Sequence, residues 1–229
     1  MTLRAIDSLI DGHPNPIEGF PFFDTATGSL GQGLSHAAGL AAAGKLDGLD
    51  KRVFCIIGDG EAREGNIWEA VDFIKDYSLK AVCPIFNCNV YAQSDKVSPQ
   101  QTAEVNAKKL EAAGFHVLTI DGHNPTEVAD ALSQHAQAQF DPDSDPIAIV
   151  ANTVKGWGIP SEQGGGHHGK AVSSLEDVLA ELDQTATQVG AMADTPLKIG
   201  MMSPKKPEAS TKNALPAFPE ACQQFGQGS

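Results

Sequence analysis

The chain has 229 residues, enough for one large or two small domains, and 41% of them are hydrophobic, which suffices for a real core. It carries 29 Asp and Glu against 16 Lys and Arg, a net charge of −13, so its surface repels nucleic acid and anionic lipid. It contains no run of eighteen apolar residues and no long apolar N-terminal segment, so we expect a cytosolic protein that does not enter a membrane.

The first regular elements are expected after a turn-rich start. Residues 1–24 carry turn-forming Gly and Pro residues and no complete element. A glycine-rich stretch at 27–33 then opens an Ala-rich helical run at 34–46, whose small residues indicate close packing against other backbone. The apolar run at 53–57 ends at Gly58 and predicts a buried parallel strand.

Strands and helices alternate over the next hundred residues. Helices are expected at about 65–77, 102–113 and 125–139, and strands at 81–86, 115–120 and 146–151, as ranges of apolar periodicity. Pro84 counts against a central position for the strand at 81–86, because proline cannot donate to a ladder. The alternation predicts an α/β fold, a parallel sheet with helices on both faces.

The last part of the chain changes in composition. Residues 156–170 are glycine-rich, and a short helix is expected at 174–182. Beyond Gly190 the apolar residues thin out, so residues 191–229 are predicted to be a linker or disordered tail. We therefore expect one folded domain over residues 1–190. None of the cysteines (Cys55, Cys83, Cys88 and Cys222) forms a CxxC pair, and we expect buried, reduced thiols.

Polar residues follow two consecutive predicted strands. Gly58-Asp59-Gly60 ends the first, and Asn89 lies thirty residues after Asp59, at the end of the next. One strand-helix-strand unit fits that interval and brings the two ends side by side. A carboxylate, an amide oxygen and a backbone carbonyl converging there would suit Mg²⁺, which fills its other positions with phosphate oxygens and water. Taken alone, the GDG sequence is equally compatible with an ordinary turn carrying a solvated Asp.

The glycine-rich loop at 28–33 is the third polar feature. Its glycines let backbone approach a ligand closely, and the helix that it opens presents an N-terminus that favours anions. It matches neither the dinucleotide fingerprint nor the P-loop. A simple packing turn is the alternative.

Together these stretches resemble the transketolase family of thiamine-diphosphate enzymes. The resemblance lies in Thr-Gly-Ser-Leu-Gly-Gln-Gly-Leu-Ser from residue 27 and in Gly-Asp-Gly-Glu-Ala-Arg-Glu-Gly-Asn-Ile-Trp-Glu-Ala from residue 58, and it runs from about residue 3 to 182. It implies a thiamine-diphosphate-binding domain of the kind that holds the diphosphate. It also implies that Asp59, Asn89 and the carbonyl of Tyr91 bind Mg²⁺.

The same resemblance places further residues at the cofactor and substrate. Gly28, Leu30 and Gly60 would lie against the cofactor. Asn87 stands where the family often has Asp, and Ser29 where Pro is frequent, but neither departure removes a metal ligand.

Two histidines gain a role from the resemblance. His13 resembles a histidine that faces the substrate and the reacting centre, and His168 one that contacts the cofactor diphosphate and the substrate. A slip of one position would give the role of His168 to His167. Without the resemblance, a turn histidine and a loop histidine are the simpler interpretations.

Two glutamates are expected at a dimer interface. Glu64 and Glu69 flank the start of the helix after GDG, where acidic residues also complement the helix dipole. In the family the matching glutamates couple two active sites, whereas Glu61 is expected to be a solvated neighbour. A partner would then cover Ile67 and Trp68, which would otherwise form an exposed apolar patch.

The implied activity is transfer of a two-carbon ketol unit between sugar phosphates, in a homodimer. The family also uses a pyrimidine-binding domain with an activating glutamate, and no such domain fits after residue 190. The chain is therefore expected to supply the diphosphate-binding half only, as a truncated fragment or, alternatively, as one subunit of a split enzyme, and to be inactive alone. Other readings are a deoxyxylulose-phosphate synthase, a 2-oxo-acid dehydrogenase subunit, or a non-catalytic binding or assembly module.

Overall fold

The computed structural model describes residues 12–16 and 23–190. The chain divides into two compact units, one of residues 1–28 with 198–229 and one of residues 29–197. The described residues of the first unit form bends, in which the Thr27 N–H donates to the Pro14 carbonyl at 3.1 Å. The predicted tail at 191–229 lies outside the described residues, so the domain limit at 190 stays a prediction. No helix in the described ranges is long and apolar enough to cross a membrane.

A parallel four-stranded sheet forms the centre of the second unit. Its strands are β1 (Val53–Gly58), β2 (Val82–Cys88), β5 (His116–Asp121) and β6 (Ile147–Asn152), in the order β1-β2-β6-β5. The chain therefore moves outward from β1 through β2 to β5, and it then returns so that β6 lies between β2 and β5. The predicted parallel sheet is confirmed.

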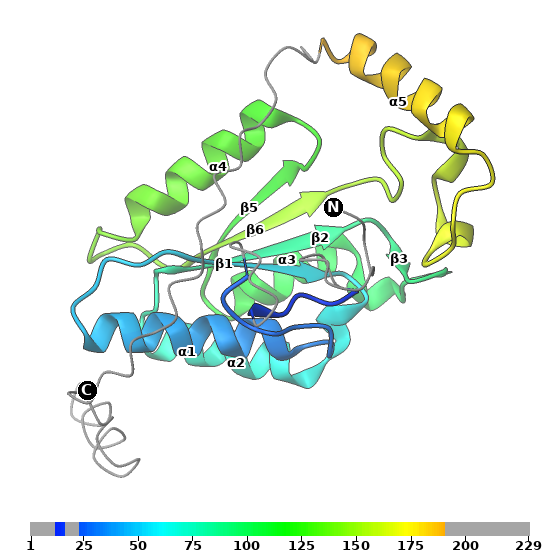
Figure 1. Ribbon diagram of the computed structural model, residues 1–229. Helices are drawn as coiled ribbons and strands as arrows, with labels where there is room; N and C mark the ends of the chain where they lie inside the picture. Colours follow the sequence, from blue (N-terminus) through cyan, green and yellow to red (C-terminus); the bar gives the residue numbers. More distant parts are fainter. Residues whose placement is uncertain (1–11, 17–22, 191–229) are drawn as a thin grey trace. The chain divides into compact units, whose positions relative to one another are not determined.

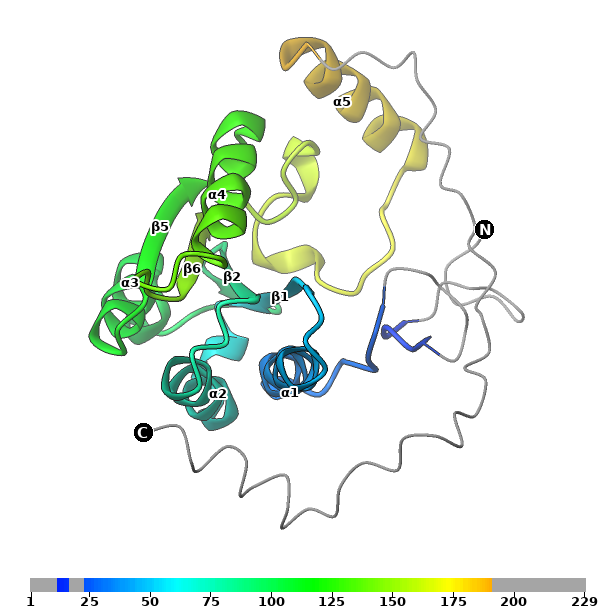
Figure 2. The same ribbon diagram turned by 90° about the vertical axis from the view of Figure 1, so that its left-hand side faces the viewer.

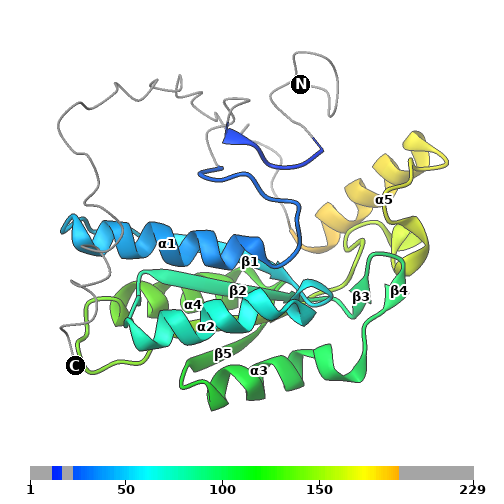
Figure 3. The same ribbon diagram turned by 90° about the horizontal axis from the view of Figure 1, so that it is seen from below.

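Helices cover both faces of the sheet, as expected. They are α1 (Gln32–Leu46), α2 (Gly65–Asp76), α3 (Ala103–Ala112) and α4 (Pro125–Ala138). Figure 1 and the view from below in Figure 3 place α4 on one face and α1, α2 and α3 on the other. The end-on view in Figure 2 shows the same division. Right-handed crossovers place α2 and α3 on one face and α4 on the other, because the β5-to-β6 step runs along the sheet against the two earlier steps.

Local capping explains where three of the helices begin. The Thr102 hydroxyl accepts from the Val105 N–H at the start of α3, and the Asn124 side chain accepts from Thr126 and Glu127 at the start of α4. Ser174 caps α5 (Leu175–Gln188) in the same way. This last helix is six residues longer at its C-terminal end than expected (188 − 182 = 6).

Short elements connect the main ones. A two-stranded hairpin of β3 (Tyr91–Ala92) and β4 (Asp95–Lys96) follows β2, and the sequence did not predict it. Single turns of 3₁₀ helix occur at η2 (Glu61–Arg63), η3 (Pro99–Gln101), η4 (Pro160–Glu162) and η5 (Gly165–His167). Strands this short lack the apolar alternation by which a strand is recognised.

The core lies between the sheet and its helices. Ile57, Val71, Phe86, Leu110 and Val150 are completely buried. The Ala-rich face of α1 is buried as well, which agrees with the close packing expected from its small residues.

The cysteines among the described residues belong to this core. Cys55, Cys83 and Cys88 are buried and free, as predicted, and Cys222 lies outside the described residues. Burial raises the pKa of Cys55 and Cys83 to about 12 and that of Cys88 to about 11. These thiols are therefore protonated and unreactive near neutral pH.

Pro84 lies in a central strand, contrary to the expectation. In β2 the carbonyl of Asn87 accepts from β1 and that of Cys88 accepts from the β6 side, so alternate residues face alternate neighbours. Pro84 faces the β6 side, and pairing with β6 begins at Ile85, although β6 itself starts at Ile147. The ladder thus begins directly after the residue that has no N–H to donate. Two residues earlier on the same side, the Val82 carbonyl is 3.1 Å from Nε2 of the buried His135 on α4.

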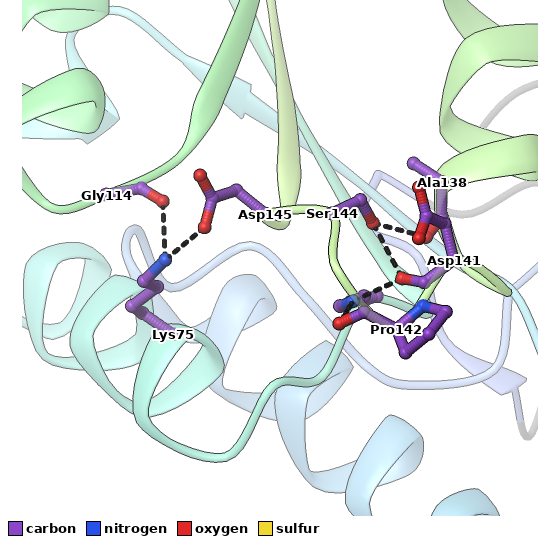
Figure 4. A network of polar contacts seen from close by, with 8 residues as sticks. Lys75, Gly114, Ala138, Asp141, Pro142, Ser144 and Asp145 are labelled. Carbon is purple, nitrogen blue, oxygen red and sulfur yellow. Dashed lines mark hydrogen bonds and ion pairs between the residues drawn. The ribbon is translucent and has the colours of Figure 1, made fainter.

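Two lysines form hydrogen bonds with the loops at the amino ends of the strands, and those of Lys75 are drawn in Figure 4. The Lys75 ammonium donates to the Gly114 carbonyl at 2.9 Å and to the Asp145 carboxylate at 2.6 Å. Lys80 donates to the carbonyls of Asp141 and Pro142, at 2.5 and 3.0 Å. The starts of β2, β5 and β6 are held together in this way.

Candidate functional site

The carboxyl ends of β1 and β2 lie side by side, as the thirty-residue spacing predicted. Gly58 is opposite Asn87 in the register, and the Asp59 N–H donates to the Asn87 carbonyl at 3.3 Å. The residues after each strand therefore meet at one edge of the sheet. In open α/β sheets, ligands bind at this edge.

Asp59 is a buried carboxylate whose partners are backbone groups. Only 2% of the residue is exposed, and its Oδ2 accepts from the Val90 N–H at 2.6 Å and its Oδ1 from the Gly60 N–H at 2.8 Å. Burial raises the pKa of this carboxyl above its ordinary value, although these N–H groups oppose the shift. No ion pair joins Asp59 to a basic side chain in the part of the chain that the structure describes. A bound cation would offset the cost of burying this charge.

The turn after β2 carries Asn89 and Tyr91. The Asn89 Oδ1 accepts from the Tyr91 N–H at 3.0 Å, and Val90 between them has a φ of +64°. This left-handed conformation is unfavourable for a β-branched residue. Strain of this kind is held in place only where surrounding contacts impose it, and here the Val90 N–H is fixed on Asp59.

The donor set at this edge fits Mg²⁺ in its chemistry. A carboxylate, an amide oxygen and a main-chain carbonyl are hard oxygen ligands, which Mg²⁺ prefers. Among residues 12–16 and 23–190, no group of three or more His, Cys, Asp or Glu side chains is placed to hold a metal. The Mg²⁺ ligands named from the sequence therefore stay a prediction.

Two buried polar residues below the turn were missed in the sequence. Gln101 donates from Nε2 to the carbonyls of Asp59 and Gly60, and Asn106 donates to the Gln101 carbonyl at 3.1 Å. Ser98 and Gln101 form a capping box around η3. The Ser-x-x-Gln pattern was visible in the sequence, but it indicates a local turn and not a contact with a segment forty residues away.

Glu61 is not the solvated neighbour that was expected. Its Oε1 accepts from the Gly31 N–H at 2.9 Å and its Oε2 from the Gly58 N–H at 3.0 Å. The carboxylate thus joins the glycine-rich loop to the end of β1. The prediction was wrong because a carboxylate can satisfy two backbone donors that are close only in the folded chain. It also takes up one donor at the N-terminus of α1, where we expected an external anion.

The glycine-rich loop needs glycine at residue 31. Gly31 has a φ of +85°, and a Cβ there would lie 2.6 Å from the Cβ of Glu64. Leu30 beside it is 57% exposed, so its side chain is available for a contact outside this unit's core. The proposed cofactor contacts of Leu30 and Gly60 stay predictions.

His13 and Gly28 belong to the first unit. A Cβ on Gly28 would lie 2.5 Å from the His13 ring, and Gly28 has a φ of +127°. The two residues predicted to face substrate and cofactor therefore contact each other, and glycine is required for that contact. Their roles toward a ligand stay predictions.

The two neighbouring histidines have different partners. The His168 Nδ1 lies 3.3 Å from the Lys155 ammonium, which also donates to the Gln93 carbonyl in the β3–β4 hairpin. His167 instead pairs through Nδ1 with the Glu162 carboxylate at 2.7 Å. Through Lys155, His168 is therefore connected to the hairpin that carries Tyr91, which favours His168 over His167 for the contact with cofactor and substrate. The choice between the two histidines stays a prediction.

Glu64 and Glu69 are exposed at the start of α2, where a partner is expected. The exposed apolar patch that was expected at Ile67 and Trp68 does not form, because Ile67 is completely buried. Trp68 is half-buried, and its Nε1 donates to the Ala62 carbonyl at 2.9 Å. Ile67 lies on the face of α2 that packs against the core, together with Val71 and Ile74. Large exposed apolar side chains occur on β1 instead, at Phe54 and Ile56.

The sequence of this chain matches one family of known proteins. The family model for the thiamine-diphosphate-binding domain of transketolase matches residues 1–201. The chain belongs to the transketolase family. Rat transketolase is 41% identical over 186 residues, which cover 80% of this chain and 28% of the relative. Human transketolase is 40% identical over the same shares of the two chains. This transketolase-family chain thus spans less than a third of the length of these relatives.

Solved transketolases share the fold of this transketolase-family chain. The enzyme from Campylobacter jejuni superposes with a TM-score of 0.65 at 24% identity, covering 97% of this chain and 32% of that one. A transketolase of Pichia stipitis, in a structure titled as a complex with xylulose 5-phosphate, gives a TM-score of 0.67 at 22% identity over 82% and 28%.

Proposed function

We propose that this chain provides the diphosphate-binding half of a thiamine-diphosphate-dependent transketolase. The observation that carries the proposal is the buried Asp59 carboxylate at the adjacent ends of β1 and β2, where it accepts from the N–H of Val90, the residue after Asn89. Family membership supplies the cofactor, and the buried charge supplies the reason for a divalent cation. The Tyr91 carbonyl is the third proposed ligand.

The chain's own residues would bind and orient. Asp59, Asn89 and the Tyr91 carbonyl would hold Mg²⁺ against the diphosphate, with Gly28, Leu30 and Gly60 against the cofactor. His13 and His168 would contact the substrate, a sugar phosphate, and His168 the diphosphate as well. When bound, thiamine diphosphate supplies an electron sink for carbon–carbon bond cleavage. Glu64 and Glu69 would meet a second subunit of a homodimer and couple two sites.

The proposal requires a pyrimidine-binding domain from the same enzyme. We expect the chain alone to show no ketol transfer, because the matched family model is that of the thiamine-diphosphate-binding domain and the chain spans 28% of the length of rat transketolase. Of the alternatives, the match to the transketolase family weighs against a deoxyxylulose-phosphate synthase and a 2-oxo-acid dehydrogenase subunit. A non-catalytic binding module remains the competing function.

Calorimetry and a coupled assay test the proposal. Thiamine diphosphate is titrated into the full chain with and without Mg²⁺, and again after a transketolase pyrimidine-binding domain is added. We expect binding that depends on Mg²⁺ and tightens with the added domain. A chain that binds no thiamine diphosphate under either condition would refute the proposal. Binding without any ketol transfer in the mixture, measured with a ketose and an aldose phosphate, would favour the non-catalytic module.

A further inference from the structure

Gln101 contacts the GDG turn from a different part of the fold. Its residue is 4% exposed, and its Nε2 donates to the Asp59 carbonyl at 2.8 Å and to the Gly60 carbonyl at 3.0 Å. One amide nitrogen thus donates to two consecutive carbonyls. The Gly60 carbonyl also accepts from the Arg63 N–H, whereas a buried carbonyl that loses its donor is destabilising, so the contact with Asp59 is not incidental.

Gln101 is itself held in place. Its Oε1 accepts from the Ser98 N–H at 3.3 Å, and its backbone N–H donates to the Ser98 carbonyl at 2.9 Å. The completely buried Asn106 on α3 donates from Nδ2 to the Gln101 carbonyl at 3.1 Å. A chain of bonds therefore runs from α3 through Gln101 to the GDG turn.

Asp59 is fixed at three of its polar groups by three segments. Its N–H donates to Asn87 on β2, its carboxylate accepts from Val90 in the turn after β2, and its carbonyl accepts from Gln101 on η3. The Gly60 N–H of the following peptide also donates to the Asp59 Oδ1, so that peptide is held at its N–H end by Asp59 and at its carbonyl end by Gln101. Gln101 is thus the restraint on this turn that comes from the η3–α3 side of the fold, and it adds to those from β2.

We propose that Gln101 is a positioning residue that sets the Asp59 carboxylate for metal binding. The inference rests on the proposed function, because it assigns Asp59 to the metal. An amide is required, because an apolar side chain donates nothing and an ionised carboxylate would repel both carbonyls. Loss of this contact lowers metal affinity without touching a ligand, as loss of groups behind metal ligands does, by about 10- to 100-fold.

The test is a titration of the full chain with Mn²⁺ in the presence of thiamine diphosphate, followed by electron paramagnetic resonance. The variants are Gln101→Leu, Gln101→Glu, Asp59→Ala and the matched control Gln100→Leu, whose side chain is exposed one residue away. We expect Gln101→Leu and Gln101→Glu to weaken Mn²⁺ binding about 10- to 100-fold. Gln100→Leu should match the unmodified chain, and Asp59→Ala should bind no specific Mn²⁺.

The outcomes separate this inference from the proposed function. If the unmodified chain binds Mn²⁺, Asp59→Ala does not, and Gln101→Leu binds as tightly as the unmodified chain, the positioning role is wrong and the metal site stands. If the unmodified chain binds no Mn²⁺, both fail.

A measurement on the unmodified chain applies even if the Gln101 variants do not fold. In ¹⁵N NMR, the Gln101 side-chain amide should exchange slowly with solvent and shift along the same Mg²⁺ saturation curve as the Val90 N–H. A Val90 signal that shifts while the Gln101 amide stays unchanged would overturn the proposal.

Discussion

At the carboxyl ends of the strands, buried polar side chains bond to backbone groups, whereas at the amino ends half-buried lysines bond to the loops. Asp59, Gln101 and Asn106 are all almost fully buried at the first edge. Lys75 and Lys80 at the second edge are only partly covered, and Asp145 is mostly exposed. The buried groups depend on one another, so a single loss at that edge leaves another buried group unsatisfied. The amino edge tolerates a loss because water can replace the partner.

Both edges contain residues other than glycine with a left-handed backbone. Val90 and Gln93 adopt it around the proposed ligands, with φ of +64° and +58°, and Ser78 adopts it at the amino edge, with φ of +48°. Such residues cost stability and are held by their surroundings. The amino edge contains a hollow of about 480 Å³. Two of the lysines that line it, Lys45 and Lys80, donate to backbone carbonyls. We therefore propose function at the carboxyl edge because of the Asp59 carboxylate, which is buried there without an ion pair to a basic side chain among the described residues.

The largest expected effect follows from removing the buried charge at the carboxyl edge. Asp59→Ala should weaken Mg²⁺-dependent binding of thiamine diphosphate by more than the roughly 10- to 100-fold expected for a residue behind the ligands, because a ligand itself is lost. Calorimetry on the chain mixed with a pyrimidine-binding domain measures it. Asp145→Ala at the amino edge is the control and should bind normally. Equal affinities for the two variants would contradict the assignment of Asp59.

The next effect concerns the packing of the glycine-rich segment on the hairpin that carries Tyr91. A Cβ on Gly165 would lie 2.0 Å from the Ser94 carbonyl oxygen, whereas a Cβ on Gly166 would meet nothing within 4 Å. Gly165→Ala should therefore lower the free energy of unfolding by about 1–3 kcal/mol, as overpacking does. Gly166→Ala serves as the matched control in urea denaturation. Two variants of equal stability would show that this segment does not pack on the hairpin.

A smaller effect depends on pH and concerns His135, the buried polar side chain at the amino edge. Burial lowers the pKa of His135 below its ordinary 6.5, with Arg52 adding to the shift. The unfolded chain then binds the proton more readily, so stability falls as the pH drops from about 6.5 toward the folded pKa. The slope cannot exceed about 1.4 kcal/mol per pH unit. Urea denaturation between pH 7.5 and 5 should show a shallower slope in His135→Gln, and equal slopes would exclude His135 as the cause.

The smallest effect is expected at the lysine ties. Lys75→Ala removes one exposed ion pair and one bond to the Gly114 carbonyl. Exposed pairs contribute little, because salt and water screen them. Thermal unfolding of Lys75→Ala should shift less than that of Gly165→Ala, and the shift should shrink in high salt. A loss as large as that of Gly165→Ala would mean that the two edges do not differ as described.

Much of the framework was predictable from the sequence alone. Apolar runs of five or six residues alternating with amphipathic stretches determine the strands and helices, because both periodicities are local properties. The thirty residues between Asp59 and Asn89 fit one strand-helix-strand unit, so their adjacency was predictable too. The capping residues Thr102 and Asn124 marked two helix starts for the same local reason.

Only the tertiary structure decided which polar groups meet. Pro84 lies in a central strand, one residue before the pairing of β2 with β6 begins, and strand order is not encoded in the local pattern. Gln101 donates to the Asp59 carbonyl, and Glu61 accepts from the Gly31 N–H. Each of these contacts joins groups that are thirty or more residues apart in the sequence. Hydrophobic periodicity specifies which face of an element is buried. It does not specify which buried donor faces which acceptor, because that depends on how the elements are packed.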